Sequence, residues 1–126
     1  MARILVIDDD EAIRLTLGEI LREEAHEVSF APNGEMGLEF YRRAPFDVVL
    51  VDLAMPVKNG LRTIKELRDQ YHDARIIAMT GADPENLPLA EEYGAGATLT
   101  KPIDNEEMIK KIDQLLRRSV GWEDVF

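Results

Sequence analysis

The chain contains no cysteine among its 126 residues. Neither a disulfide framework nor a metal site with thiolate ligands can therefore form, and a cytoplasmic location is the simplest expectation. The first apolar run, Ile4 to Ile7, is followed at once by acidic residues. Such a short run cannot serve as a signal peptide or a membrane span, so we expect a protein that is neither exported nor held in a membrane.

Basic residues are also scarce. The chain has 15 Lys and Arg against 25 Asp and Glu, which gives a net charge of −10 and a pI near 4.6. This balance repels the phosphates of nucleic acids and anionic lipids, so neither direct nucleic-acid binding nor membrane binding is expected. The length suits one domain with a substantial core and leaves no room for a second domain.

Short apolar runs alternate along the chain with amphipathic segments. Val48 to Val51 is entirely apolar, which is typical of a strand buried on both faces of a parallel sheet. Val28 and Phe30 instead alternate with other residues, so their strand is expected at a sheet edge. The predicted strands cover 4–7, 26–31, 48–51, 75–80 and 97–100, and the predicted helices cover 11–24, 35–43, 61–71, 83–93 and 104–116.

The helix over 83–93 is the least regular of these elements. Pro84 can open a helix, but Pro88 lacks the N–H that an interior position needs. We therefore expect this helix to begin late, near Leu87, or to have a loose first turn. The last helix has a clearer start, because Asp104 and Glu107 have the spacing of a capping box.

Five strands alternating with five helices predict an α/β fold with a doubly wound, five-stranded parallel sheet covered on both faces. The expected strand order is 2-1-3-4-5, which places the first and third strands about 4.8 Å apart. Asp8 and Asp9 follow the first strand and Asp52 ends the third. Taken alone, Asp52 is equally explained as a turn or helix cap, but this topology brings all three acids to one edge. Asp10 is expected only to cap the next helix.

Three carboxylates held this close raise one another's pKa or require a cation, and oxygen ligands without His or Cys indicate Mg²⁺. Two further strands end at the same edge, one in Thr80 and the other before Lys101. A hydroxyl, an ammonium and Mg²⁺ around one carboxylate form a site suited to a phosphoryl group, whose transfer depends mainly on positioning and charge neutralisation.

Four motifs now support a resemblance to a known family. They are Ile4-Leu5-Val6-Ile7-Asp8-Asp9, Asp52-Leu53-Ala54-Met55-Pro56 with Gly60 eight residues after the Asp, Thr80-Gly81 and Lys101-Pro102. Together they resemble the receiver domain of two-component response regulators, which has the flavodoxin-like order assumed above. The resemblance covers about residues 2–118 and leaves 119–126 as a short tail or the start of a linker. It does not distinguish a free-standing receiver from one cut out of a longer regulator.

The resemblance implies that Asp52 accepts a phosphoryl group from a phosphohistidine on a histidine kinase or histidine phosphotransfer protein. It also implies Mg²⁺ as the cofactor, a cis bond at Lys101-Pro102, and no turnover of a separate substrate. Thr80 and Lys101, with the N–H groups of Ala54 and Gly81, would contact the phosphoryl oxygens. The implied metal ligands are Asp9 directly, Asp8 through water, Asp52, and the carbonyl of Ala54.

The resemblance also implies how the domain signals. Thr80 would move toward the phosphoryl group, and the surface formed by the fourth helix, fifth strand and fifth helix would rearrange to bind a downstream protein. One position departs from the pattern, because Thr98 stands where the family usually has an aromatic residue. This leaves open how the movement would be transmitted. Ala54 and Ala82 occupy positions that tune the access of hydrolytic water, and the lifetime of the phosphorylated form also stays open.

Two alternatives have different chemistry. A phosphatase of the haloacid dehalogenase type needs a second acid two residues after the nucleophile, and that place is Ala54. A binding module that keeps the fold without phosphorylation is disfavoured by the complete set of Asp9, Asp52, Thr80 and Lys101. The missing aromatic at position 98 keeps this second alternative open.

Overall fold

The computed structural model describes residues 1–55, 59–81 and 84–117. Pro56, Ala82, the predicted boundary at 118 and the tail 119–126 lie outside these ranges. The elements are β1 (Arg3–Ile7), α1 (Glu11–Glu23), β2 (Glu27–Ala31), α2 (Gly34–Arg43), β3 (Val48–Asp52), α3 (Gly60–Gln70), β4 (Ile76–Thr80), a 3₁₀ turn (Pro84–Asn86), α4 (Leu87–Tyr93), β5 (Ala97–Thr100) and α5 (Asn105–Arg117).

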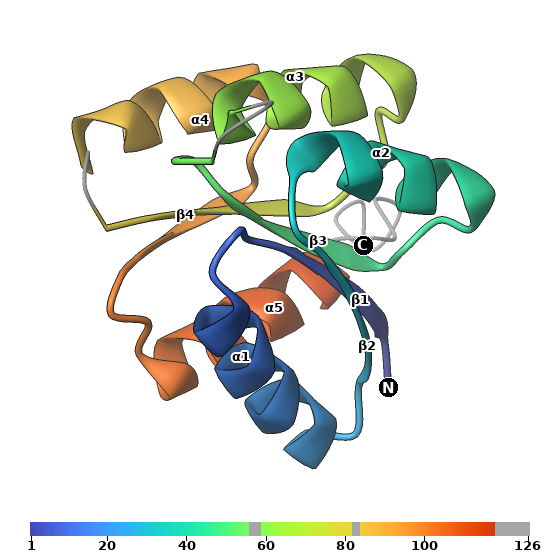
Figure 1. The fold of residues 1–126 in the computed structure, drawn as a ribbon, viewed down its shortest axis with the longest axis vertical. Coiled ribbons are helices and arrows are strands. Elements are labelled where there is room, and N and C mark those ends of the chain that lie inside the picture. Colours follow the sequence, from blue (N-terminus) through green and yellow to red (C-terminus); the bar gives the residue numbers. More distant parts are fainter. Residues whose placement is uncertain (56–58, 82–83, 118–126) are drawn as a thin grey trace, which may run out of the picture.

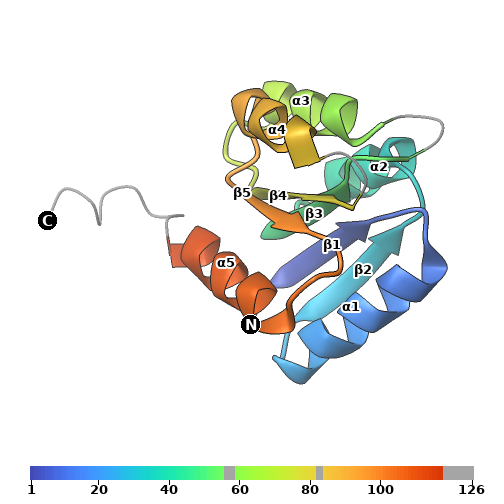
Figure 2. The same cartoon turned by 90° about the vertical axis from the view of Figure 1, so that its left-hand side faces the viewer.

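All five strands are parallel and lie in the order β2-β1-β3-β4-β5, as the sequence predicted (Figure 1). The predicted edge position of β2 is confirmed, and every residue of β3 and β4 is buried. Helices α1 and α5 cover one face of the sheet, and α2, α3 and α4 cover the other (Figure 2). The fold is therefore a three-layer α/β sandwich.

Successive residues of the central strands point into two separate cores. On β1, Leu5 and Ile7 pack in the core beneath α2, α3 and α4, whereas Ile4 and Val6 pack in the core beneath α1 and α5. This alternation follows from the two-residue period of a strand. Because both faces of the central strands are covered by apolar side chains, charged groups can be presented only where these strands end.

The helix starts agree with the capping predictions. The Asp10 carboxylate accepts a hydrogen bond from the Ala12 N–H at 2.9 Å, and Asp104 accepts one from the Glu107 N–H at 3.0 Å. Helix α4 begins at Leu87 after the 3₁₀ turn, which confirms the late start expected from Pro88. None of the helices in the described part of the chain combines the length and the apolar character that a membrane crossing requires.

Candidate functional site

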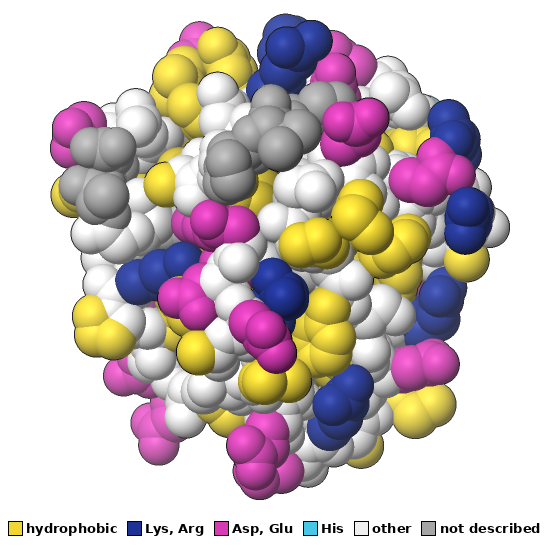
Figure 3. Space-filling view, in the orientation of Figure 1, with side chains coloured by type: hydrophobic (Ala, Val, Ile, Leu, Met, Phe, Trp, Pro, Cys, Tyr) yellow, Lys and Arg dark blue, Asp and Glu magenta, His cyan; other side chains and the backbone are white. Residues whose placement is uncertain are grey.

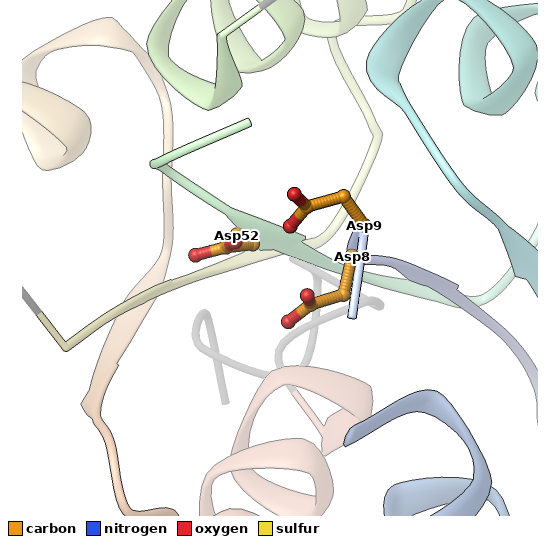
Figure 4. A group of neighbouring side chains, drawn as sticks. All are labelled: Asp8, Asp9 and Asp52. Atoms are coloured by element: carbon orange, nitrogen blue, oxygen red, sulfur yellow. The ribbon is translucent and has the colours of Figure 1, made fainter. Parts of the chain in front are cut away.

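Three carboxylates meet at the carboxyl edge of the sheet. Ile7, at the end of β1, is the register partner of Val51 on β3. The next residues on the two strands, Asp8 and Asp52, therefore emerge side by side. Figure 4 shows both side chains beside that of Asp9, and one carboxylate oxygen from each of the three lies within 4.8 Å of the others.

Asp52 is the central carboxylate of this cluster, and its side chain is almost fully buried. Burial away from water, followed by the charge of Asp8, raises the pKa of Asp52 to about 6, although Lys101 and the Ala54 N–H act in the opposite direction. The Ala54 N–H donates to Asp52 Oδ1 over 3.4 Å. At neutral pH Asp52 is thus mostly ionised, but at a cost in free energy.

Lys101 reaches into the cluster from the end of β5. Its Nζ lies 2.8 Å from Asp8 Oδ2 and 3.4 Å from Asp52 Oδ1. Burial acts to lower the pKa of Lys101, but the hydrogen bonds and charges of Asp8 and Asp52 outweigh it and raise that pKa. Lys101 is therefore an ammonium shared between two carboxylates, and the peptide bond to Pro102 is cis, as the resemblance implied.

Asp8 is completely buried, and several groups hold it, among them the Ala31 carbonyl, which accepts from the Asp8 N–H over 3.1 Å. Besides Lys101, the Asp10 N–H donates to Asp8 Oδ1 over 2.9 Å, and Arg14 Nη1 donates to the Asp8 carbonyl over 2.6 Å. Arg14 was not among the site residues predicted from the sequence. A long side chain that returns to a backbone carbonyl produces no characteristic spacing, so the sequence offered no signal for it.

Thr80 and Gly81 lie at the same edge, Thr80 as the last residue of β4 and Gly81 directly after it. Thr80 is buried, and its carbonyl accepts a hydrogen bond from the Lys101 N–H over 2.7 Å. A Cβ at Gly81 would lie 3.2 Å from the Cβ of Lys101, so the absence of a side chain leaves room for the lysine stem. All sequence-predicted site residues are thus placed at one edge of the sheet.

The cluster has the donor set of a site for a hard divalent cation. Asp8, Asp9 and Asp52 offer carboxylate oxygens, the ligand type that Mg²⁺ prefers, with no imidazole or thiolate among them. Burial and, after it, the charge of Asp8 raise the pKa of Asp52, and a bound cation would offset both effects by stabilising the ionised carboxylate. The residues present therefore fit Mg²⁺.

The site opens onto a face where charges of both signs gather. In the orientation of Figure 1, Asp and Glu side chains surround Lys and Arg side chains near the middle of the molecule (Figure 3). Beside Lys101 lies a mainly apolar cleft of about 600 Å³ between α1 and the segment 101–105. Its lining includes Ile13, Leu17 and Ile103, so an apolar surface of a partner can be accommodated next to the carboxylates.

Thr98, the residue that departs from the receiver pattern, lies partly buried on β5. Its carbonyl accepts a hydrogen bond from Lys111 on α5. The contact joins β5 to α5, two elements of the surface expected to change on signalling.

Comparison with known proteins identifies a family. The model of the response regulator receiver domain matches residues 4–113. The transcriptional regulatory protein CpxR of Escherichia coli (strain K12) is 38% identical over 125 residues, which cover 98% of this chain and 53% of CpxR. Protein PilH of Pseudomonas aeruginosa is 35% identical over 119 residues, covering 92% of this chain and 98% of PilH.

The chain therefore spans about half the length of CpxR and nearly all of PilH. Among solved structures, the receiver domain of the Francisella response regulator 1452 superimposes with a TM-score of 0.88 at 27% identity, over 95% of this chain and all of that one. The flavodoxin-like fold expected from the sequence is thus shared with solved receiver domains.

Proposed function

The chain belongs to the response regulator receiver domain family, and from that premise we propose that Asp52 accepts a phosphoryl group from a phosphohistidine. The observation that carries the proposal is that Asp52 lies within reach of both the neighbouring acids, Asp8 and Asp9, and the Lys101 ammonium, which contacts Asp8 as well as Asp52. One buried carboxylate is thereby flanked by the acids that suit a cation and by the ammonium that suits an anion.

In the proposed transfer, an Asp52 carboxylate oxygen attacks phosphorus while the bond from phosphorus to the histidine nitrogen breaks. The imidazole leaves with the bonding electron pair and takes up a proton, and Asp52 becomes an acyl phosphate. Asp52 is ready to attack at neutral pH, because its pKa of about 6 leaves it mostly ionised. No proton has to be removed from the nucleophile.

Lys101 is proposed to stabilise the incoming phosphoryl oxygens, since its ammonium already lies 3.4 Å from Asp52. The hydroxyl of Thr80 and the N–H groups of Ala54 and Gly81 are proposed as further donors. Mg²⁺, when bound, neutralises negative charge on the phosphoryl oxygens. Asp9 and Asp52 would ligate it directly, Asp8 through water, and the Ala54 carbonyl would complete the protein ligands.

The proposed phosphodonor is a histidine kinase or a histidine phosphotransfer protein, and the cleft beside Lys101 offers it an apolar surface next to the nucleophile. The proposed output is a change in protein contacts on the face of α4, β5 and α5. The net charge of −10 disfavours direct contact of this domain with nucleic acid. We propose a cytoplasmic signalling domain without turnover of a separate substrate.

Intact-protein mass spectrometry with acetyl phosphate and Mg²⁺ tests the proposal. We expect one added phosphoryl group on the native chain and none on Asp52→Asn. Asp10→Asn is the matched control, because Asp10 belongs to the same acidic run but caps α1, and this variant should be labelled like the native chain. Equal labelling of the native chain and Asp52→Asn would remove Asp52 from its role.

A phosphorylation-independent binding module remains the second candidate, and Thr98 in place of an aromatic residue is the observation that favours it. Titration of downstream partners with the native chain before and after phosphorylation separates the two functions. The main proposal expects affinity to change on phosphorylation, whereas unchanged affinity would favour the second candidate.

A further inference from the structure

The two ends of α4 are held very differently. In the described part of the chain, no side chain caps the first turn of α4, where Asn86 has a helical backbone and Pro88 lacks an N–H. A 3₁₀ turn, Pro84–Asn86, directly precedes the helix. Although Leu87 packs against the core, the N-terminal end of α4 therefore lacks the side-chain cap that would fix its first turn.

The C-terminal end is closed by a complete backbone motif. The Gly94 N–H donates to the Ala90 and Glu91 carbonyls, and the Ala95 N–H donates to the Ala90 carbonyl over 2.9 Å. Gly94 has a φ of 131°, a conformation that residues with a side chain rarely adopt. This end has one defined geometry.

Arg68 on α3 then fixes the closed end to the body of the domain. Its Nη2 donates to the Gly94 carbonyl over 2.9 Å and to the Ala74 carbonyl over 2.5 Å, and its Nη1 donates to the His72 carbonyl. A Cβ on Gly94 would lie 2.8 Å from Arg68 Nε. The glycine thus allows the arginine to pack directly against the end of α4.

We propose that Arg68 is the anchor of α4, so that the C-terminal end of this helix is a fixed pivot and the N-terminal end is the part that moves. The use of this movement in signalling rests on the proposed function, whereas the anchor itself does not. Only a guanidinium suits the position, because its planar fork donates to three carbonyls from two different segments at once.

Hydrogen exchange of the unphosphorylated protein, followed by mass spectrometry, tests the anchor. We expect Arg68→Met, which keeps the apolar stem and removes the donors, to accelerate exchange over 87–96 by about tenfold or more and to leave 3–23 unchanged. Arg68→Lys should fall between the native chain and Arg68→Met. Arg62→Met is the matched control, because Arg62 lies on the same helix in an exposed pair with Glu66, and it should leave both regions unchanged.

Unchanged exchange over 87–96 in both Arg68 variants would overturn the anchor. An equal acceleration over 3–23 would also overturn it, because Arg68 would then stabilise the whole domain rather than α4.

Amide chemical shifts before and after phosphorylation test the pivot separately. We expect larger changes at Leu87 and Leu89 than at Tyr93 and Gly94 in the native chain. Changes of equal size at both ends would overturn the pivot while leaving the anchor result intact. A chain that is never labelled on Asp52 would contradict the proposed function instead, and the exchange experiment would still decide the anchor.

Discussion

The interior of the sheet and its carboxyl edge are made by the same strands but have opposite energetics. Inside, β3 and β4 bury every residue, nearly all of them apolar, and this burial stabilises the fold. At the edge, Asp8 and Asp52 are buried as well, but there burial raises the pKa of Asp52 and opposes its ionisation. Apolar burial in the interior thus supplies the folding free energy that offsets the cost of burying the charged groups at the edge.

The largest expected effect belongs to the interior. Leu50→Ala on β3 removes a fully buried side chain and should lower the free energy of unfolding by about 2 to 5 kcal/mol in urea denaturation. The additional stability gained with Mg²⁺ should stay unchanged, because Leu50 packs in the core beneath α1 and α5 and not in the acidic cluster. If Leu50→Ala kept the native stability but no longer responded to Mg²⁺, the interior and the edge of the sheet could not have the separate roles described above.

The next effect is a gain of stability at the edge. Without divalent cations at pH 7, Asp52→Asn should be about 1 to 3 kcal/mol more stable than the native chain, because the pKa of Asp52 rises from 3.8 to about 6 on folding. Between about pH 4 and pH 6 the folded state binds more protons at Asp52 than the unfolded state does. The stabilising contribution of Asp52 to the free energy of unfolding is therefore fully present below about pH 4 and is lost as pH rises through about 6.

Urea denaturation of both proteins between about pH 4 and pH 8 measures that difference. The stability advantage of Asp52→Asn should grow with pH and level off above about pH 7. A stability difference that stays constant over this range would show that folding does not raise the pKa of Asp52.

Much of this comparison was accessible from the sequence. The alternation of five strands with five helices predicted a doubly wound sheet, and the strand order usual for this fold placed Asp8 and Asp52 at one edge. Pro88 likewise gave the late start of α4, because a missing N–H has the same consequence in any context.

Long side chains that contact backbone carbonyls were not accessible. Arg14 and Arg68 reach carbonyls whose positions are set by the packed tertiary structure, and no spacing in the sequence encodes them. The closer approach of Lys101 to Asp8 than to Asp52 was also not predictable, because the two Nζ–Oδ distances differ by less than an ångström.

A smaller effect separates the acids of the edge from one another. Asp9 is exposed, so Asp9→Asn should hardly change stability without metal. It should nevertheless weaken Mg²⁺ binding by at least about tenfold in calorimetric titration, because one charge-assisted contact contributes roughly 1.5 to 3 kcal/mol. Asp10→Asn should bind Mg²⁺ with nearly native affinity, and equal weakening in both variants would argue for a diffuse acidic surface.

The smallest effect is expected away from both regions. Arg62 and Glu66 form an exposed pair on α3 with 3.7 Å between Nε and Oε1. Arg62→Met should change the free energy of unfolding by less than about 0.5 kcal/mol. A loss comparable to that of Leu50→Ala would mean that this surface contributes to the fold in a way that the contacts of Arg62 do not explain.

The most direct test of the account combines Asp52 and the cation in one thermodynamic cycle. The free energy of unfolding is measured at neutral pH for the native chain and Asp52→Asn, each with and without Mg²⁺. The account predicts that Mg²⁺ at about ten times its dissociation constant stabilises the native chain by about 1.4 kcal/mol and Asp52→Asn by clearly less. Equal stabilisation of both proteins, or of neither, would contradict a site in which Asp52 and its neighbouring acids hold the metal together.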